Sequence, residues 1–124
     1  GPTTGGIIIA FEVARQMGLR AVYVESENGF KTLRRNKTLP AGQKILIVDD
    51  VLTTGGSILA SQEAIERAGG EVVGFGVLID RREPNIVIDK PVYGAYKANA
   101  VSYAPDEVPE WLAAVPIKKP GTSK

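Results

Sequence analysis

The chain has 124 residues, 44% of them hydrophobic and 23% charged, with 15 basic and 14 acidic side chains. That length and composition are typical of one water-soluble globular domain, residues 1–124, with a single core; a net charge of +1 does not indicate binding to nucleic acid, and no apolar run approaches the ~20 residues that cross a membrane. Cysteine and histidine are absent, which excludes disulfides, thiol nucleophiles, histidine triads and the usual zinc sites.

The first residues have the composition of a turn that leads into a helix. Residues 1–6 read GPTTGG, and the chain's one methionine is Met17, so residue 1 is not an ordinary translation start. A processed N-terminus would explain this, but we expect a fragment of a longer protein. Apolar residues recur at helical spacing from Ile7 to Met17, and Gly18 stands where a helix would stop.

The next segment contains one clear strand and one ambiguous stretch. Residues 21–25, AVYVE, alternate in the manner of a strand. Residues 26–43 are polar and basic, with Lys31, Arg34, Arg35 and Lys37, and predict either a hairpin or a mobile loop. Such a basic cluster is most often a solvated loop.

Residues 45–57, ILIVDDVLTTGGS, carry the strongest signal in the chain. Four apolar residues predict a buried strand, two acidic residues end it, and a hydroxyl- and glycine-rich turn leads to a helix over 58–68, closed by Gly69 and Gly70. Backbone N–H groups at such a helix start suit a phosphate. Carboxylates accept hydrogen bonds from vicinal hydroxyls, so the stretch predicts a sugar-phosphate site.

The remaining residues predict less regular structure. Residues 72–80 form a buried strand, in which Gly74 and Gly76 indicate close packing rather than a dinucleotide fingerprint. A charged turn follows at 81–85, then one or two short strands near a sheet edge over 86–96, because Pro91 interrupts pairing. We expect Trp111 and Leu112 in a short helix, with Trp111 as a packing anchor, and fraying over 118–124.

Alternation of strands and helices predicts an α/β fold with a parallel sheet flanked by helices. Ligands bind such sheets at the carboxyl ends of the strands. The turns at 1–6, 49–57 and 80–82 should therefore meet at one edge. Since no strand precedes residues 1–6, we expect the sheet to be incomplete at its N-terminal side.

These motifs resemble a known enzyme family. The apolar strand, paired acids and TTGGS turn are similar to the ribose-phosphate signature of type I phosphoribosyltransferases. GPTTGGI, VLIDRRE, TLRRNKTLPAGQKILIVDD and PIKKPGTSK narrow the resemblance to orotate phosphoribosyltransferases, over nearly all of the chain but without that family's N-terminal hood and first core strand. A phosphorylatable receiver domain shares the KILIVDD pattern, but its next turn differs.

The resemblance implies transfer of phosphoribosyl from phosphoribosyl pyrophosphate (PRPP) to orotate, giving orotidine monophosphate. Asp49 and Asp50 would bind the ribose hydroxyls, and Thr53 and Arg81 would hold orotate. Without the resemblance, Arg81 would be expected to cap the strand and pair with Glu83. The remaining implied residues are Thr3, Thr4 and Gly5 for pyrophosphate, Lys31 as a catalytic charge, and Val51, Leu52, Thr54, Gly55, Gly56 and Ser57 with Thr53 for PRPP.

The resemblance further implies Mg²⁺ bound with PRPP, a cytoplasmic location and a homodimer, with no metal site of the protein's own. The family often carries a lysine at the position of Gly5 and a Lys-Asp-His run in its flexible loop, and this sequence has neither. Lys31, Arg34 or Arg35 would have to supply that charge. A non-catalytic phosphoribosyl-binding regulator, an inactive fragment of this fold, and a phosphoribosyltransferase for another base therefore stay open as alternatives.

Overall fold

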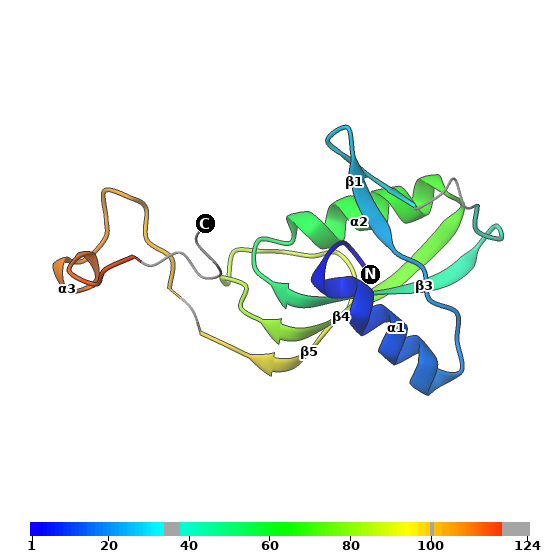
Figure 1. The fold of residues 1–124 in the computed structure, drawn as a ribbon, viewed down its shortest axis with the longest axis horizontal. Helices are drawn as coiled ribbons and strands as arrows, with labels where there is room; N and C mark the ends of the chain where they lie inside the picture. The colour runs from blue at the N-terminus through cyan, green and yellow to red at the C-terminus, as the bar shows by residue number, and fades with distance from the viewer. Residues whose placement is uncertain (34–37, 100, 118–124) are drawn as a thin grey trace, which may run out of the picture.

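The computed structural model describes residues 1–33, 38–99 and 101–117. Arg34, Arg35 and Lys37 lie outside the described residues, as does the tail expected to fray, 118–124. The described part contains eight elements (Figure 1). They are α1 (Gly5–Met17), β1 (Val24–Glu27), β2 (Phe30–Leu33), β3 (Gln43–Leu52), α2 (Gly56–Arg67), β4 (Gly70–Asp80), β5 (Val92–Lys97) and α3 (Glu110–Ala113).

The centre of the fold is a βαβ unit that runs from β3 through α2 to β4. The two strands are parallel, with Ile47 opposite Phe75, and β5 pairs in parallel with the other side of β4. The strand order β3-β4-β5 leaves β5 at one edge, as the position of Pro91 predicts. A methyl group at Gly74 would lie 3.0 Å from the Pro91 backbone oxygen, so close packing does explain this glycine.

The core lies between α2 and the sheet. Ile58 and Ile65 of α2 pack with Leu52 of β3 and Phe75 of β4, each at most 3% exposed. Burial of each such side chain contributes roughly 1.5–3 kcal/mol. The predicted buried face of α2 is confirmed, and its packing fixes where the helix starts relative to the end of β3.

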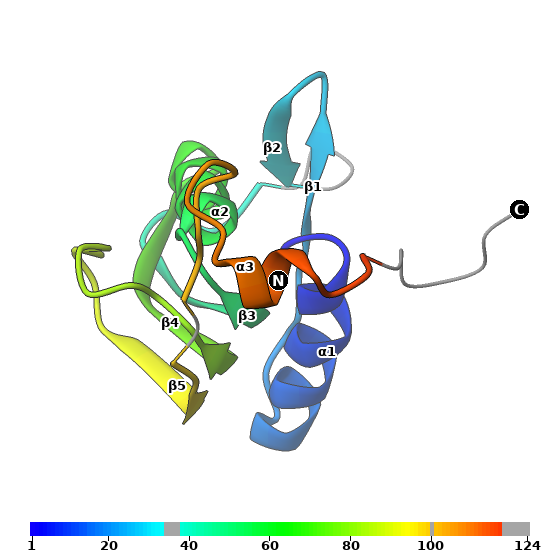
Figure 2. The ribbon, with the colours of Figure 1, turned by 90° about the vertical axis from the view of Figure 1, so that its left-hand side faces the viewer.

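Helix α1 lies on the opposite side of β3 from α2 (Figure 2). Ala10 and Ala14 face inward and are buried, and such small side chains permit close approach to the strand. Gly18 ends the helix with φ of 66°, the left-handed conformation that favours glycine. The prediction of helices on both faces of a parallel sheet is confirmed.

Strand β1 begins later than the sequence pattern predicts. The strand expected at 21–25 is instead Val24–Glu27, which pairs antiparallel with β2 in a hairpin. A strand requires a hydrogen-bonded partner, and β2 offers one to residues 24–27 whereas residues 21–23 have no full strand beside them. Of the two alternatives for residues 26–43, the hairpin is therefore found over the first part of that stretch.

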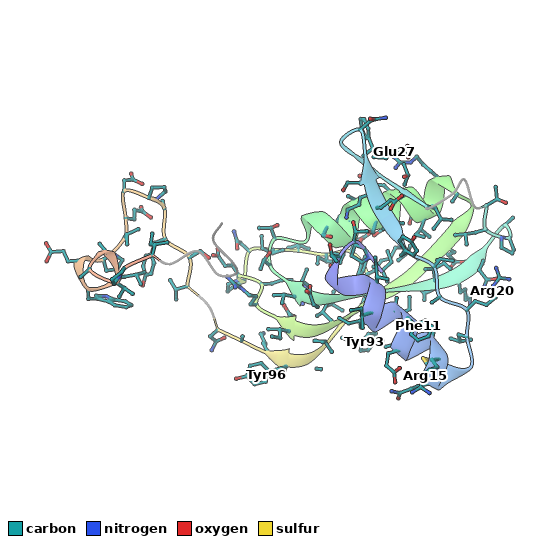
Figure 3. All side chains as sticks on the ribbon, viewed as in Figure 1. Phe11, Arg15, Arg20, Glu27, Tyr93 and Tyr96 are labelled. Atoms are coloured by element: carbon teal, nitrogen blue, oxygen red, sulfur yellow. The ribbon has the colours of Figure 1, made fainter. Side chains whose placement is uncertain are left out.

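The segment after β5 leads away from the sheet to α3 (Figure 1). Trp111 is 68% exposed, so the prediction that it anchors the tail is wrong, although the short helix is present. In Figure 3, Tyr96 points outward from β5, and Phe11 and Arg15 point outward from α1. Within the described residues no helix is long and apolar enough to span a membrane.

Candidate active site

Three turns meet at the carboxyl ends of β3 and β4, as the sequence predicts. A methyl group at Gly5 would collide with the Asp50 carboxylate, and one at Gly6 would lie 3.1 Å from Asp49 Oδ1. On the other side, the Arg81 backbone N–H donates to the Leu52 backbone oxygen at 2.9 Å. These contacts place the N-terminal turn and the turn after β4 on either side of the segment that follows β3.

The two adjacent aspartates are held by the backbone of the strand's last residues. Asp49 Oδ1 accepts from the Asp50 N–H at 2.9 Å, and Asp50 Oδ1 accepts from the Val51 N–H at 2.7 Å. Each carboxylate keeps one oxygen outside these bonds. Those remaining oxygens can accept hydrogen bonds from hydroxyl groups of a ligand.

Asp49 has the more perturbed environment. Burial raises the pKa of its carboxyl, and the neighbouring Asp50 charge acts in the same direction. The Lys31 ammonium opposes the shift through its charge, so Lys31, on β2, exerts its field on this carboxylate. The structure thus brings a cation from the hairpin into the electrostatic range of the paired acids.

The segment from Thr53 to Ser57 forms an open N-terminus on α2. Gly55 is the N-cap residue, with φ of 86°, and no side chain caps the helix or places an acid in its first turn. Thr53, Thr54 and Ser57 are exposed. Free N–H donors, the positive end of the helix dipole and nearby hydroxyls are suited to a phosphate group.

Val51 and Leu52 connect the acids to this loop. The Leu52 side chain is 2% exposed and lies in the core, so any ligand contact from Leu52 would use its backbone. Val51 is more open, at 37%.

The N-terminal turn presents the start of α1 to the same region. Thr4 is the N-cap residue of α1, no side chain caps the helix, and the Thr3–Thr4 peptide bond is cis. Thr3 is tied to β1, because its N–H donates to the Val24 backbone oxygen at 2.9 Å. Gly5, the first residue of α1, lies beside the Asp50 carboxylate, whereas the contact given for Thr3 is with β1.

Two arginines follow β4, and they have different surroundings. Arg82 donates to both carboxylate oxygens of Asp80, at 2.9 and 2.7 Å, and its backbone N–H also donates to Asp80. This ion pair lowers the pKa of the Asp80 carboxyl and raises that of the Arg82 guanidinium. Arg81 is exposed and makes no ion pair with Glu83 within the described residues.

Sequence reasoning missed the Asp80–Arg82 pair. The signal was an acid at a strand end with arginine two residues later, where a turn returns the second side chain to the first. The pair lines a cavity of about 430 Å³ beside the ends of β4 and β5, together with Glu83, Ile86 and Lys97. Of the two arginines after β4, Arg82 is bound to Asp80, whereas the exposed guanidinium of Arg81 is available to an anionic ligand.

No group of three acidic side chains that could bind a metal ion occurs within the described residues. Asp49 and Asp50 could offer a few oxygens to a hard cation, which suits Mg²⁺ that arrives already bound to phosphates and water. The donor set does not suit a permanent metal centre of the protein itself.

The fold and the site together define a class of protein. A parallel sheet with an open helix N-terminus after paired acids is a sugar-phosphate architecture, and the family model described as phosphoribosyl transferase domain matches residues 1–110. The chain belongs to this family. Among solved structures, adenine phosphoribosyltransferase from Rhodothermus marinus has a similar fold, with a TM-score of 0.67 at 24% identity over 79% of this chain and 67% of that one.

More similar relatives share one particular activity in their names. Orotate phosphoribosyltransferase from Pelotomaculum thermopropionicum is 43% identical over all 124 residues, and that from Caldanaerobacter subterraneus is 40% identical. This chain spans about 65% of the length of both relatives. The structure of orotate phosphoribosyltransferase from Aeropyrum pernix aligns with a TM-score of 0.66 at 26% identity, over 78% of this chain and 58% of that one.

Proposed function

We propose that this chain is the core of an enzyme that transfers phosphoribosyl from PRPP to orotate, releasing pyrophosphate and forming orotidine 5′-monophosphate. The observation that carries the proposal is the meeting of paired acids, an uncapped helix start and an exposed arginine at one sheet edge. The orotate phosphoribosyltransferases at 35–43% identity support the choice of orotate.

Ribose 5-phosphate would be bound by the end of β3 and the start of α2. Asp49 and Asp50 accept hydrogen bonds from the ribose hydroxyls through the oxygens that their backbone contacts leave free. The N–H groups and hydroxyls of residues 53–57 surround the 5′-phosphate. These contacts fix the anomeric carbon relative to the two neighbouring turns.

Orotate would be held by Arg81 and Thr53. The backbone bond between Arg81 and Leu52 keeps the two turns together, and the exposed guanidinium can donate two parallel hydrogen bonds to a carboxylate. An orotate nitrogen then attacks the anomeric carbon as the bond to pyrophosphate breaks. The nearby carboxylates favour positive charge that develops on the ribose.

Pyrophosphate would leave toward Thr3, Thr4 and Gly5, at the open start of α1. Lys31 supplies a positive charge on the same side, in keeping with its influence on Asp49. Asp49 and Asp50 could contribute oxygens to a Mg²⁺ ion that arrives with PRPP, and such an ion would neutralise charge on the leaving group. Transfer needs no covalent nucleophile, which is consistent with a sequence that lacks cysteine and histidine.

We further propose that the enzyme is cytoplasmic and acts as a homodimer. Both follow from the resemblance to orotate phosphoribosyltransferases. Sedimentation of the purified chain would test the second, with one species of twice the chain mass as the expected outcome.

The test of the reaction is direct turnover. The chain is incubated with PRPP, Mg²⁺ and orotate, and loss of orotate absorbance is followed; the double variant D49N/D50N is the control and should be inactive. Binding of PRPP without turnover would favour a non-catalytic regulator or an inactive fragment. Turnover with adenine but not orotate would overturn the base assignment.

The Arg81→Ala variant tests the base site separately. Loss of a charged hydrogen-bonding partner costs about 1.5–3 kcal/mol, so the KM for orotate should rise roughly 10- to 150-fold with the KM for PRPP little changed. Arg20→Ala, an exposed arginine outside the site, is the matched control (Figure 3). An unchanged orotate KM in Arg81→Ala would remove Arg81 from the base site.

A further inference from the structure

The backbone that leads into Arg81 is tied to both neighbouring strands. The Arg81 N–H donates to the Leu52 oxygen at the end of β3, and the Ala98 N–H, just after β5, donates to the Asp80 oxygen, both at 2.9 Å. The Asp80 oxygen and the Arg81 N–H belong to one peptide unit. That peptide unit is therefore held from both sides, and it fixes where the chain enters the turn.

A side chain fixes the exit of the same turn. Asp80 Oδ1 accepts from the Arg82 backbone N–H at 3.1 Å and from Arg82 Nε at 2.9 Å, and Oδ2 accepts from Arg82 Nη2 at 2.7 Å. An aspartate that binds the backbone two residues later closes a tight turn, and the two bonds to the guanidinium reinforce it. Arg81 is the middle residue of this closed turn.

The Asp80 side chain is held firmly enough to act as an anchor. Its residue is 7% exposed, and a methyl group at Gly94 of β5 would lie 2.9 Å from the Asp80 Cβ. A side chain at residue 94 would therefore displace Asp80. The pair differs in this respect from the exposed pair of Glu12 and Arg15 on α1, of a kind that contributes little to stability.

The same bonds make Arg82 a poor ligand for an anion. Its Nε and Nη2 already donate to Asp80, and the carboxylate charge beside them opposes a second negative group. Arg81 is exposed and lies between the two members of the pair in sequence. The effect of Arg82 on a ligand would therefore pass through the position of Arg81.

We propose that Asp80 and Arg82 are positioning residues of the base site, and that their ion pair holds the turn in the geometry in which Arg81 binds an anionic base. This role rests on the proposed function for the identity of the base. A guanidinium binds a carboxylate through two parallel hydrogen bonds, so small displacements weaken the contact. Bound base and transition state share that contact, and its loss should raise KM and leave kcat unchanged.

Asp80→Asn separates positioning from simple electrostatics. Assayed well below its Tm, this variant should raise the KM for orotate about 10-fold or more, with kcat and the KM for PRPP within about 2-fold of the parent. By charge alone, removal of an acid near an anionic base would lower that KM, as would release of Arg82 to bind the base directly. A lowered or unchanged KM for orotate would overturn the proposal.

Variants of the two arginines test whether the effect passes through Arg81. In an Arg81→Ala background, Asp80→Asn should change the KM for orotate by less than about 2-fold, because no guanidinium is left to position. The full effect in that background would contradict the proposal. Arg82→Lys keeps the charge but loses the two-pronged contact, so its KM for orotate should also rise; a parental value would show that charge alone suffices and would overturn the positioning role.

Ile65→Val controls for a general loss of stability. Ile65 is 3% exposed and lies against Gly70, at the opposite end of β4 from Asp80. The substitution lowers stability without a contact to the turn, so the KM for orotate should stay at the parental value. A rise equal to that of Asp80→Asn would mean that the pair acts only through global stability, which would overturn the proposal.

Amide exchange tests the anchor without any substrate. In Asp80→Asn the Arg81 N–H should exchange at least ~10-fold faster than in the parent, while the Gly42 N–H, bonded to the Gly69 oxygen at the other end of the sheet, stays unchanged. Unchanged exchange at Arg81 would overturn the proposal. A parent chain that transfers nothing to orotate would refute the proposed function instead, and the exchange rates would still decide whether the pair holds the turn.

Discussion

Asp49 and Asp50 are neighbours in sequence, but the strand gives their carboxylates different surroundings. Asp49 is 7% exposed, whereas Asp50 is open to solvent. Alternation along a strand turns successive side chains to opposite faces, and the start of α1 lies against both. The position of the pair at a strand end could be predicted from the sequence. The difference in burial could not, because it depends on where α1 packs.

Affinity for PRPP should depend on the ionisation of Asp49. Because burial raises the pKa of Asp49, its carboxylate is protonated and loses acceptor capacity at a pH above the usual 3.8 for aspartate. The KM for PRPP should therefore rise as the pH falls through this raised pKa. Steady-state kinetics across mildly acidic pH would measure it, and a KM that stayed flat down to the ordinary aspartate range would contradict the assignment.

The raised pKa of Asp49 also makes folding stability depend on pH. Acid should weaken PRPP binding, but it should increase the contribution of Asp49 to stability. A raised pKa means that the folded state favours protonated Asp49, so this stabilising contribution is complete below pH 3.8 and lost as pH rises through the folded pKa. Asp49→Asn should therefore unfold at a higher temperature than the parent chain at pH 7. Thermal melts at neutral pH would test this.

Asp80 offers a test of the ion pair that was not predicted. Asp80→Asn removes the charge partner of the partly buried Arg82 and should cost about 1–3 kcal/mol in the free energy of unfolding, measured in urea at pH 7. Because the pKa of Asp80 is lowered, its contribution is present above pH 3.8 and lost as pH falls through the folded pKa.

Wild type and Asp80→Asn should therefore converge in acid. Arg82→Gln is the matching change on the other side, and the double variant should cost less than the two single changes added together. Additive costs would show that the two side chains act independently. From sequence alone the resemblance assigned a role to Arg81, and the acid-to-arginine spacing that marks Arg82 was not used.

At the scale of elements, α2 sets the position of the proposed phosphate site. Its apolar spacing predicted the buried face, which the structure confirms in Ile58 and Ile65. The start of β1 was predicted three residues before its observed position. Alternation in AVYVE indicates a half-buried segment, but it does not show which residues have a strand partner for their hydrogen bonds.

Removing the Ile58 side chain should loosen this arrangement. Ile58→Ala, at a residue 2% exposed, should lower the free energy of unfolding by roughly 2–5 kcal/mol, because it leaves a cavity under the first turn of α2. Ile8→Ala on α1 is a matched control, since Ile8 is 75% exposed and its loss should cost within about 0.5 kcal/mol. Similar losses for both, in chemical unfolding, would contradict the packing.

At the scale of the whole molecule, the described chain is a βαβ core to which β5, α1, the β1–β2 hairpin and α3 are added. These elements differ in how closely they pack on the core. The parallel pairing of β3 with β4 was predictable, since a strand–helix–strand pattern runs along residues 43–80, whereas β5 was expected only as a short edge strand. The β1–β2 hairpin is separate from the main sheet. The sequence did not predict this, because a local pattern does not show with which strand a segment pairs. The same holds for Trp111, a large aromatic that any composition rule would place in a core.

The exposed position of α3 yields a simple expectation. Trp111→Ala should change the free energy of unfolding by less than about 0.5 kcal/mol, because the side chain is 68% exposed. Phe75→Ala, at the centre of the core, should cost about 3–5 kcal/mol in the same urea titration. A cost above 2 kcal/mol for Trp111→Ala would indicate that the tail packs on the core.

The continuous run from Gln43 to Asp80 contains the proposed diol acceptors and the phosphate loop, whereas leaving-group and base contacts come mainly from turns outside it. The residues proposed to bind ribose 5-phosphate, the part of the substrate that different phosphoribosyltransferases would share, thus lie in one continuous stretch of the chain. Proteins that descend from such a chain could therefore change their nucleobase specificity, or lose catalysis and act as sensors, while they still bind ribose 5-phosphate.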